Sequence, residues 1–184
     1  MRDLYIDCDG VIFDTIRVAF NEMKELNINL ADQFAITNYF INVDWNHLID
    51  EGGILNDSIE KIKILDESKE FASVKIATHR CSYAEGIVKT QKFNELIPNI
   101  KIITIPRKIN KHHALPAQNH ILIDDSKTKV KQWIENGGIG IVFNPNIDHL
   151  IYPYELNDNP YFITNDILDA LVVNNLYKNK TYVK

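Results

Sequence analysis

The chain has 184 residues, of which 45% are hydrophobic and 24% are charged, and its formal net charge is -5. This length supports one domain with an insertion, and the composition excludes a disordered, collagen-like or disulfide-framed chain. The acidic balance gives no general attraction to polyanions, so duplex nucleic acid is not the favoured partner.

The first part of the chain predicts a strand, a helix and an irregular insertion. Residues 4–6 form an apolar run typical of a strand, and apolar residues at three- and four-residue steps predict a helix over 15–26. Residues 27–56 lack a clear period and end at two glycines, before a further helix expected from Ser58. We therefore predict a small helical cap, inserted after the first strand and helix, over approximately residues 27–67.

The rest of the chain alternates between strands and helices. Apolar, largely β-branched runs predict strands at 74–77, 100–105, 121–123 and 139–143. Ser82 and Ser126 are expected helix caps, and residues 162–176 are expected to form a terminal helix before a solvated tail at 178–184. Strands that are apolar on both faces and separated by helices predict an α/β fold. We expect one Rossmann-like domain over residues 1–184, its parallel sheet covered by helices on both faces.

Polar residues gather where the predicted strands end. In open parallel sheets, sites form at the carboxyl ends of the strands. The residues there, or in the loop before a strand, are Asp7, Asp9, Thr78, Arg80, Lys111, Asp124 and Asp125. Converging carboxylates need a cation, and oxygen ligands without a thiolate or histidine cluster suit Mg²⁺ better than zinc. Thr78 and Lys111 would suit a phosphate held against that ion, which indicates a phosphoryl substrate.

The segment DCDGVIFDT at residues 7–15 resembles the nucleophile loop of the haloacid dehalogenase superfamily of phosphotransferases. Thr78 after a strand, a downstream lysine and ILIDDS at residues 121–126 resemble the later motifs of that superfamily, in the same order. The resemblance covers roughly residues 1–145. The DGV variant, with LIDD and WIENGGIGIVF, is most similar to the 5'(3')-deoxyribonucleotidase-like and phage-type branch.

The resemblance implies a role for each matched aspartate. Asp7 would be the nucleophile that forms an aspartyl phosphate, and Asp9 would be the general acid and base. Asp124 would bind Mg²⁺ together with Asp7 and the carbonyl of Asp9. Asp125 would assist directly or through water.

The residues expected to bind phosphate match less uniquely. Thr78 and one lysine would hold phosphate oxygens. Lys108 and Lys111 both precede the fourth strand, and we prefer Lys111 because it lies nearer to that strand. Arg80 is an addition within ATHRCS, and it is expected to clamp a substrate anion in a bidentate contact.

The resemblance predicts a magnesium-dependent phosphatase that acts through an aspartyl phosphate on a small phosphorylated substrate, in the first instance a nucleoside monophosphate. Tyr39, Phe40 and Trp45 have two interpretations: stacking on a base, or, as we favour, forming the core of the cap.

Three alternatives stay open. One is a phosphosugar phosphatase or mutase, because DGVIFDT also resembles β-phosphoglucomutase, although the later motifs differ. Another is a nucleic-acid 3'-end phosphatase, for which the sequence lacks a basic, aromatic groove. The third is a phosphoacceptor signalling module, which the order of the motifs along the chain disfavours.

The sequence also bears on location. Cys8 and Cys81 cannot build a disulfide framework and do not have a zinc-binding spacing. The first residues lack the apolar stretch of a signal peptide, and no 18-residue apolar run occurs. We therefore expect a cytoplasmic protein without a membrane partner.

Overall fold

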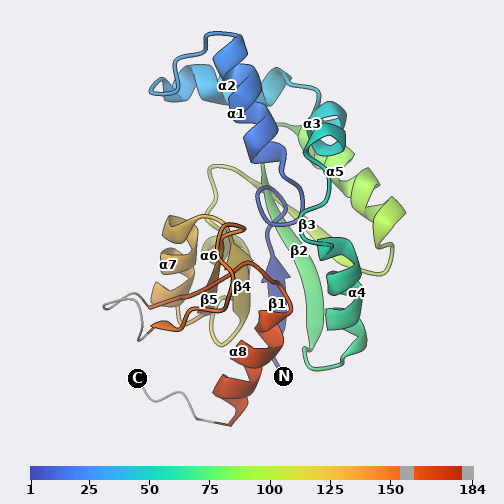
Figure 1. Ribbon diagram of the computed structural model, residues 1–184, viewed down its shortest axis with the longest axis vertical. Helices are drawn as coiled ribbons and strands as arrows, with labels where there is room; N and C mark the ends of the chain where they lie inside the picture. Colours follow the sequence, from blue (N-terminus) through green and yellow to red (C-terminus); the bar gives the residue numbers. More distant parts are fainter. Residues whose placement is uncertain (154–159, 180–184) are drawn as a thin grey trace.

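A computed structural model of the chain describes residues 1–153 and 160–179. At its centre lies a six-stranded sheet in the order β3-β2-β1-β4-β5-β6, and every pair of neighbouring strands is parallel (Figure 1). The strands are β1 (Asp3–Ile6), β2 (Ser73–Arg80), β3 (Lys101–Pro106), β4 (Ile121–Asp124), β5 (Ile139–Phe143) and β6 (Phe162–Thr164). The order changes direction between β1 and β4, and this switch point is where open α/β sheets form a crevice.

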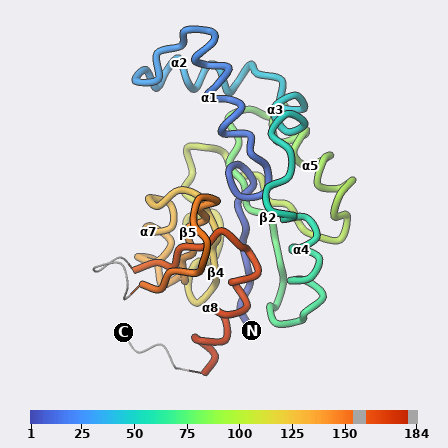
Figure 2. The backbone as a smooth tube through the Cα atoms, viewed as in Figure 1, coloured from blue at the N-terminus to red at the C-terminus, as the bar shows by residue number. Residues whose placement is uncertain are grey.

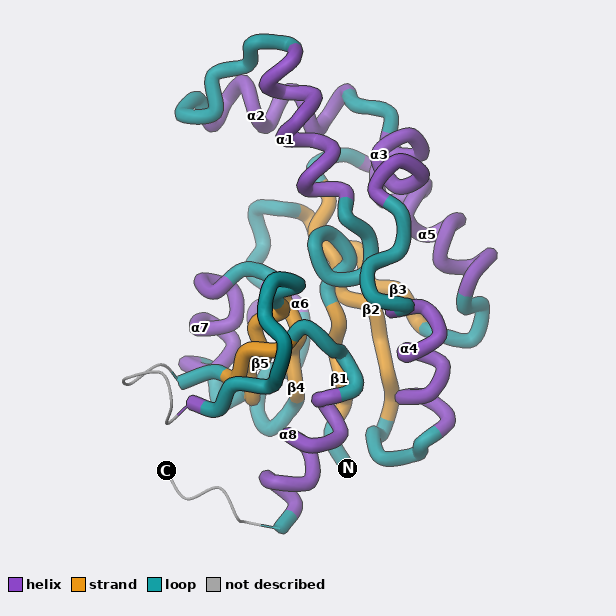
Figure 3. The backbone as a smooth tube through the Cα atoms, in the orientation of Figure 1, coloured by secondary structure: helices purple, strands orange, loops and turns teal. Residues whose placement is uncertain are grey.

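Helices surround this sheet (Figure 3). They are α1 (Thr15–Glu25), α2 (Gln33–Asn42), α3 (Trp45–Gly52), α4 (Ser58–Glu67), α5 (Tyr83–Leu96), α6 (Lys111–Ala114), α7 (Lys127–Glu135) and α8 (Asp169–Lys178). Within the described residues, no helix is both long and apolar enough to span a membrane.

Apolar cores lie on both faces of the sheet. Leu4 and Ile6 of β1 belong to a buried cluster that also contains residues of α4, α5 and α8. Tyr5 points to the opposite face, where its ring packs edge-on against Trp133 of α7, 5.5 Å between centroids. Because successive side chains of a strand alternate, β1 joins both cores. The predicted α/β fold, with a parallel sheet covered on both faces, is confirmed.

A second group of helices stands over the carboxyl ends of the strands. Figures 1 and 2 show α1, α2 and α3 at one end of the molecule, beyond the sheet. These three helices share a buried cluster made of Val18, Ala19, Met23, Ile36, Tyr39, Phe40, Trp45 and Leu48. In contrast, Ile59, Ile62 and Leu65 of α4 lie in the sheet's own core. The boundaries 27–67 stay a prediction, and from this packing we propose a cap that begins with α1 and ends after α3.

Short polar contacts fix the starts of several helices. Ser82 Oγ accepts a hydrogen bond from Glu85 N at 3.1 Å, and Ser126 Oγ accepts one from Lys129 N at 3.5 Å, as predicted. The carboxylate of Glu85 does not complete a capping box, because it accepts from Cys81 N instead, at 2.5 Å. This contact holds Glu85 at the end of β2, beside the crevice.

The prediction of one helix over 162–176 is wrong in its first part. Residues 162–164 form β6, which pairs with β5, and α8 begins only at Asp169. Ile163 and Thr164 are β-branched, which favours a strand over a helix. The edge of β5 also offers them backbone hydrogen-bond partners. Lys178, the first residue of the predicted tail, is the last residue of α8 and pairs with Glu70. Residues 180–184 of that tail lie outside the described part.

Candidate active site

The loop after β1 turns sharply and carries the first two predicted site residues. Asp7 N donates to Ile123 O at 2.9 Å, which ties the end of β1 to β4. Gly10 has a positive φ of 77°, and a Cβ at this position would lie 2.6 Å from Asp125 Oδ2. Only glycine fits both this backbone and this close approach. The turn therefore brings the DCDG segment against the acidic pair that follows β4.

Three carboxylates meet at the switch point. Oxygen atoms of Asp7, Asp124 and Asp125 all lie within 4.8 Å of one another. Asp7 Oδ1 is buried and accepts no hydrogen bond from the described residues, although Lys111 Nζ lies 2.9 Å away as an ion pair. A buried oxygen without a hydrogen-bond donor and an all-oxygen set of ligands fit a hard divalent cation such as Mg²⁺. The Asp9 carboxylate is not part of this cluster, so its predicted contribution through the backbone carbonyl stays a prediction.

Two lysines neutralise this acidic cluster. Lys111 is buried, with Nζ 2.9 Å from Asp7 Oδ1 and 2.6 Å from Asp124 Oδ2. Lys129, in the first turn of α7, lies 3.4 Å from Asp7 Oδ2 and 3.5 Å from Asp124 Oδ1. Of the two lysines that the sequence left open, Lys111 therefore lies in the site, whereas Lys108 is exposed.

The charges around the cluster shift the pKa values of two of its three acids in opposite directions. Burial alone would raise the pKa of the Asp7 carboxyl, but Lys111 and Lys129 outweigh it and hold that pKa well below its usual range. Burial, together with the charges of Asp7 and Asp124, raises the pKa of Asp125. Asp7 is therefore held ionised, which is the state a nucleophile or metal ligand needs.

Asp9 lies in a separate hydrogen-bonded group. Its Oδ1 accepts from Thr15 Oγ1 at 2.8 Å, and its Oδ2 accepts from Lys89 Nζ at 2.5 Å and from Thr78 Oγ1 at 3.4 Å. Thr78 is fully buried, so the structure brings this predicted residue to the site, in contact with Asp9. Thr78 also lies 3.4 Å from Lys89 Nζ, as the acceptor of a further hydrogen bond.

Lys89 was not predicted from the sequence. Its side chain is fully buried, pairs with Asp9 and with Glu85 at 2.6 Å, and lies 4.3 Å from the ring of Trp45 in the cap. Burial alone would lower the pKa of Lys89, but the two carboxylates raise it, so the lysine keeps its charge. Its one signal in the sequence is the Glu85–Lys89 spacing of four, which is equally typical of a solvated helix face.

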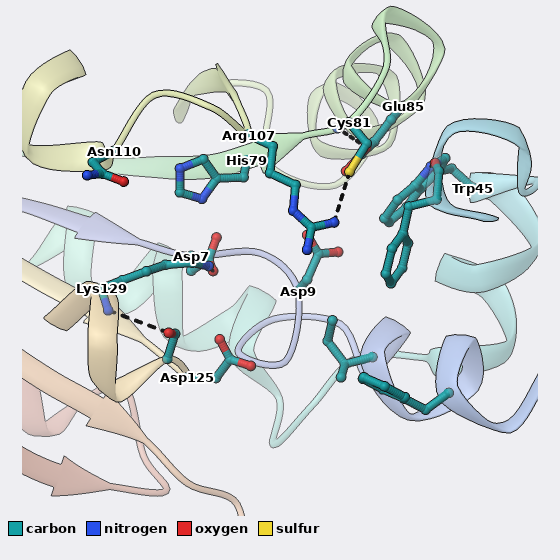
Figure 4. Close-up of a pocket in the computed structure, with 14 residues that line it drawn as sticks. Asp7, Asp9, Trp45, His79, Cys81, Glu85, Arg107, Asn110, Asp125 and Lys129 are labelled. Atoms are coloured by element: carbon teal, nitrogen blue, oxygen red, sulfur yellow. Dashed lines mark hydrogen bonds and ion pairs between the residues drawn. The ribbon is translucent and has the colours of Figure 1, made fainter. Parts of the chain in front are cut away.

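A cavity of about 440 Å³ opens over these groups (Figure 4). Its lining residues are Asp7, Asp9, Ile16, Phe20, Phe40, Trp45, His79, Cys81, Glu85, Arg107, Asn110, Asp125, Ser126 and Lys129. In Figure 4, Asp7, Asp125 and Lys129 lie at one end and Trp45 at the other. The cavity thus joins an acidic, metal-competent end to an apolar wall contributed by the cap.

Arg80 is not among the residues that line this cavity. Its guanidinium stacks on the ring of Tyr83, 4.2 Å from the centroid, and it lines a different hollow with Tyr83 and Thr104. The expected bidentate clamp from Arg80 does not fit this placement. Instead, Arg107, the residue after β3, extends into the cavity, and no motif or spacing in the sequence distinguished it.

The three cap aromatics lie mainly in the core of the cap. Tyr39 is 8% exposed and donates to Glu22 Oε2 at 2.6 Å, away from the cavity. Phe40 and Trp45 stack on each other at 5.9 Å, and both also line the cavity wall. Two of the three aromatics therefore form cap core and cavity wall at once.

Comparison with solved structures shows that the chain shares its fold with proteins described as haloacid dehalogenase-type hydrolases. YfnB from Bacillus subtilis, assigned to these hydrolases and bound to magnesium, matches with a TM-score of 0.59 and 15% identity over 95% of this chain and 98% of that one. The haloacid dehalogenase-like protein SP0104 from Streptococcus pneumoniae matches at 0.53 and 17%, over 94% and 98%. D,D-heptose 1,7-bisphosphate phosphatase from Burkholderia thailandensis matches at 0.51 and 12%, over 94% and 97%.

At these identities the likeness establishes the fold. No family model matches the sequence, and no curated protein matches it either.

Proposed function

We propose that the protein is a magnesium-dependent phosphomonoester hydrolase that works through an aspartyl phosphate on Asp7. One observation carries this proposal: a buried carboxylate at the end of β1 lies between two lysines and two further carboxylates, at the switch point of the sheet. Lysines beside a nucleophilic carboxylate suit an incoming phosphate dianion, because phosphoryl transfer depends on positioning and charge neutralisation. The fold shared with magnesium-bound YfnB supports the same reaction class.

In the first step, an oxygen of Asp7 attacks the phosphorus of the substrate. The new bond joins Asp7 to phosphorus and the ester bond from phosphorus to the alcohol breaks. Asp9 enters this step in its protonated form, which the second step regenerates, and gives that proton to the departing alkoxide. Lys111 and Lys129 would hold the phosphate oxygens, because both lysines lie beside the Asp7 carboxylate. Asp7, Asp124 and Asp125 would hold Mg²⁺, and the bound ion would further neutralise the phosphate charge.

In the second step, water attacks the phosphorus of the aspartyl phosphate. Asp9 takes a proton from that water, the bond from Asp7 to phosphorus breaks, and inorganic phosphate leaves with the Asp7 carboxylate restored. Asp9 suits both steps because Thr15 and Lys89 fix its carboxylate at the edge of the cavity.

The substrate we propose is a nucleoside monophosphate, as in the 5'(3')-deoxyribonucleotidase-like branch that the sequence resembles. The support is the apolar wall of Ile16, Phe20, Phe40 and Trp45, because flat bases pack on aromatic side chains. A phosphosugar is the second candidate, because a heptose bisphosphate phosphatase shares the fold. Phosphate esters of either class, and a 3'-phosphorylated oligonucleotide, form the natural substrate panel.

The test is turnover of that panel with Mg²⁺, by the native protein and by Asp7→Asn. We expect release of phosphate by the native protein, its loss in chelator with recovery on added Mg²⁺, and a loss of at least about a thousandfold in Asp7→Asn. Lys108→Ala is the matched control, and it should keep native turnover because Lys108 is exposed outside the site. Native rates in chelator or in Asp7→Asn would contradict the proposal, and a single phosphorylation without turnover would indicate a signalling module.

A further inference from the structure

Arg107 is the residue after β3, and its side chain extends into the cavity. Its backbone N donates to Arg80 O at 3.0 Å, which fixes the start of the loop against β2. Its Nη1 lies 3.4 Å from Cys81 Sγ, and its Cζ lies 5.8 Å from the centroid of the Phe40 ring. Across the described residues, no carboxylate lies within ion-pair distance of this guanidinium. None of its N–H donors therefore has a carboxylate partner among those residues.

The other cations around the acidic end are already engaged. Lys111 and Lys129 pair with Asp7 and Asp124, and Lys89 pairs with Asp9. Arg107 lies apart from that end: Figure 4 shows it between His79 and Trp45, with Asn110 on the far side of His79. A substrate with its phosphate at Asp7 and a ring on the Trp45 wall would extend past Arg107.

We propose that Arg107 is a specificity-determining residue that binds the hydrogen-bond acceptor edge of the group attached to the phosphate. This inference rests on the proposed phosphatase function. Arginine is a donor only, and its planar fork matches two acceptors that lie in one plane. Arg107 would therefore favour a substrate group that presents carbonyl or ring-nitrogen acceptors along a flat edge, or a carboxylate. It would disfavour a group with an amino donor at the same position.

The test compares nucleotides whose major-groove edge changes from acceptor to donor, together with two smaller phosphate esters. In the pairs dGMP with dAMP and dUMP with dCMP, a carbonyl on one base is replaced by an amino group on the other. Phosphoglycolate offers a carboxylate instead, and phenyl phosphate offers a flat ring with no acceptor. Values of kcat/KM are measured for the native protein, Arg107→Ala, Arg107→Lys and Lys108→Ala. Lys108 is the matched control, since it is the adjacent exposed cation and does not line the cavity.

We expect Arg107→Ala to lose on the order of tenfold more on the carbonyl-bearing base of each pair than on its amino-bearing partner or on phenyl phosphate. Arg107→Lys should recover part of that loss, and Lys108→Ala should show no discrimination. If the acceptor is a carboxylate, the selective loss appears on phosphoglycolate instead, which also supports the inference.

An equal loss on every substrate, phenyl phosphate included, would overturn the inference, because Arg107 would then act on the transferred phosphate or on the fold. No loss on any substrate would overturn it too. In both cases the phosphatase proposal survives if Asp7→Asn is inactive. If the native protein hydrolyses none of these esters, both proposals fail together.

Discussion

Lys89 ties three parts of the molecule together through one buried charge. Its ammonium contacts Asp9 from the β1 loop and Glu85 from its own helix, and it lies against the Trp45 ring of the cap. A buried charge is costly to leave unpaired, so both carboxylates depend on this lysine. The acid and base of the proposed reaction is therefore held in place by a residue that is closed off from solvent.

Replacing Lys89 tests this dependence. Lys89→Met leaves the buried Glu85 and the partly buried Asp9 without a counter-charge, and we expect a loss of about 3 kcal/mol in the free energy of unfolding, with a fall in kcat. Urea unfolding and steady-state kinetics measure the two effects. Lys92→Met is the control on the same helix: its partly exposed pair with Asp50 should contribute less than about 1 kcal/mol.

The double variant Lys89→Met/Glu85→Gln separates structure from positioning. It removes the Glu85 charge, so much of the lost stability should return while kcat stays low, because Asp9 still lacks its lysine. Recovery of native kcat in the double variant would contradict the positioning of Asp9 by Lys89.

The site residues differ in how clearly the neighbouring sequence predicts that they lie at the site. Asp7, Asp9, Asp124 and Asp125 follow apolar strands directly, so the parallel sheet alone predicts that they converge. Lys89 and Arg107 gave no such signal, because their environments depend on packing between distant segments. Lys89 is buried by Trp45 of the cap, and Arg107 enters the cavity because its loop is bonded to β2.

Among the elements, β1 depends on a buried polar contact as well as on its apolar faces. Tyr5 packs on Trp133, and its hydroxyl donates to Asp3 Oδ2 at 3.3 Å. Burial, and then the charge of Asp3, raises the pKa of Tyr5 to about 12. The usual value in an unfolded chain is about 10. Folding therefore favours the neutral tyrosine in β1.

This difference predicts a loss of stability at alkaline pH. Below about pH 10 the contribution is fully present, because Tyr5 is neutral in both states. Between about pH 10 and 12 the Tyr5 hydroxyl loses its proton only in the unfolded chain. The free energy of unfolding therefore falls, by about 2 kcal/mol over this range. Urea unfolding of native protein and Tyr5→Phe at about pH 9 and about pH 11.5 measures it. The free energy of unfolding of the native protein should exceed that of Tyr5→Phe by less at the higher pH. The same difference at both pH values would contradict the role of Tyr5.

Element prediction succeeded for β1 to β5, missed β6, and was weaker for the cap. The strands of the central sheet are apolar on both faces, and β4 and β5 are buried throughout, so their sequence alone is distinctive. The segment 27–56 lacks a period because it holds two short helices. Asp32 and Asp44 cap them, each accepting hydrogen bonds from two backbone amides, a signal that the apolar pattern concealed. Short helices decided by tertiary packing give little periodicity.

At the scale of the whole molecule, the cap and the sheet each supply one end of the cavity. The carboxyl ends of the strands provide Asp7 and Asp9, and α1 and the following two helices provide the apolar wall. The proposed chemistry follows from the motifs, because it depends on residues at the strand ends. The substrate does not, because it depends on how the cap packs over them.

The central claim is that the phosphoryl group passes through Asp7, and trapping that intermediate tests it most directly. Asp9→Asn is mixed with p-nitrophenyl phosphate and Mg²⁺, because this good leaving group departs without a proton, while attack of water on the aspartyl phosphate lacks its base. After an acid quench, mass spectrometry should find one phosphoryl group on the peptide that contains Asp7, and none in the Asp7→Asn/Asp9→Asn double variant. Release of p-nitrophenol with no phosphoryl group on Asp7, or with the group on another residue, would contradict the account.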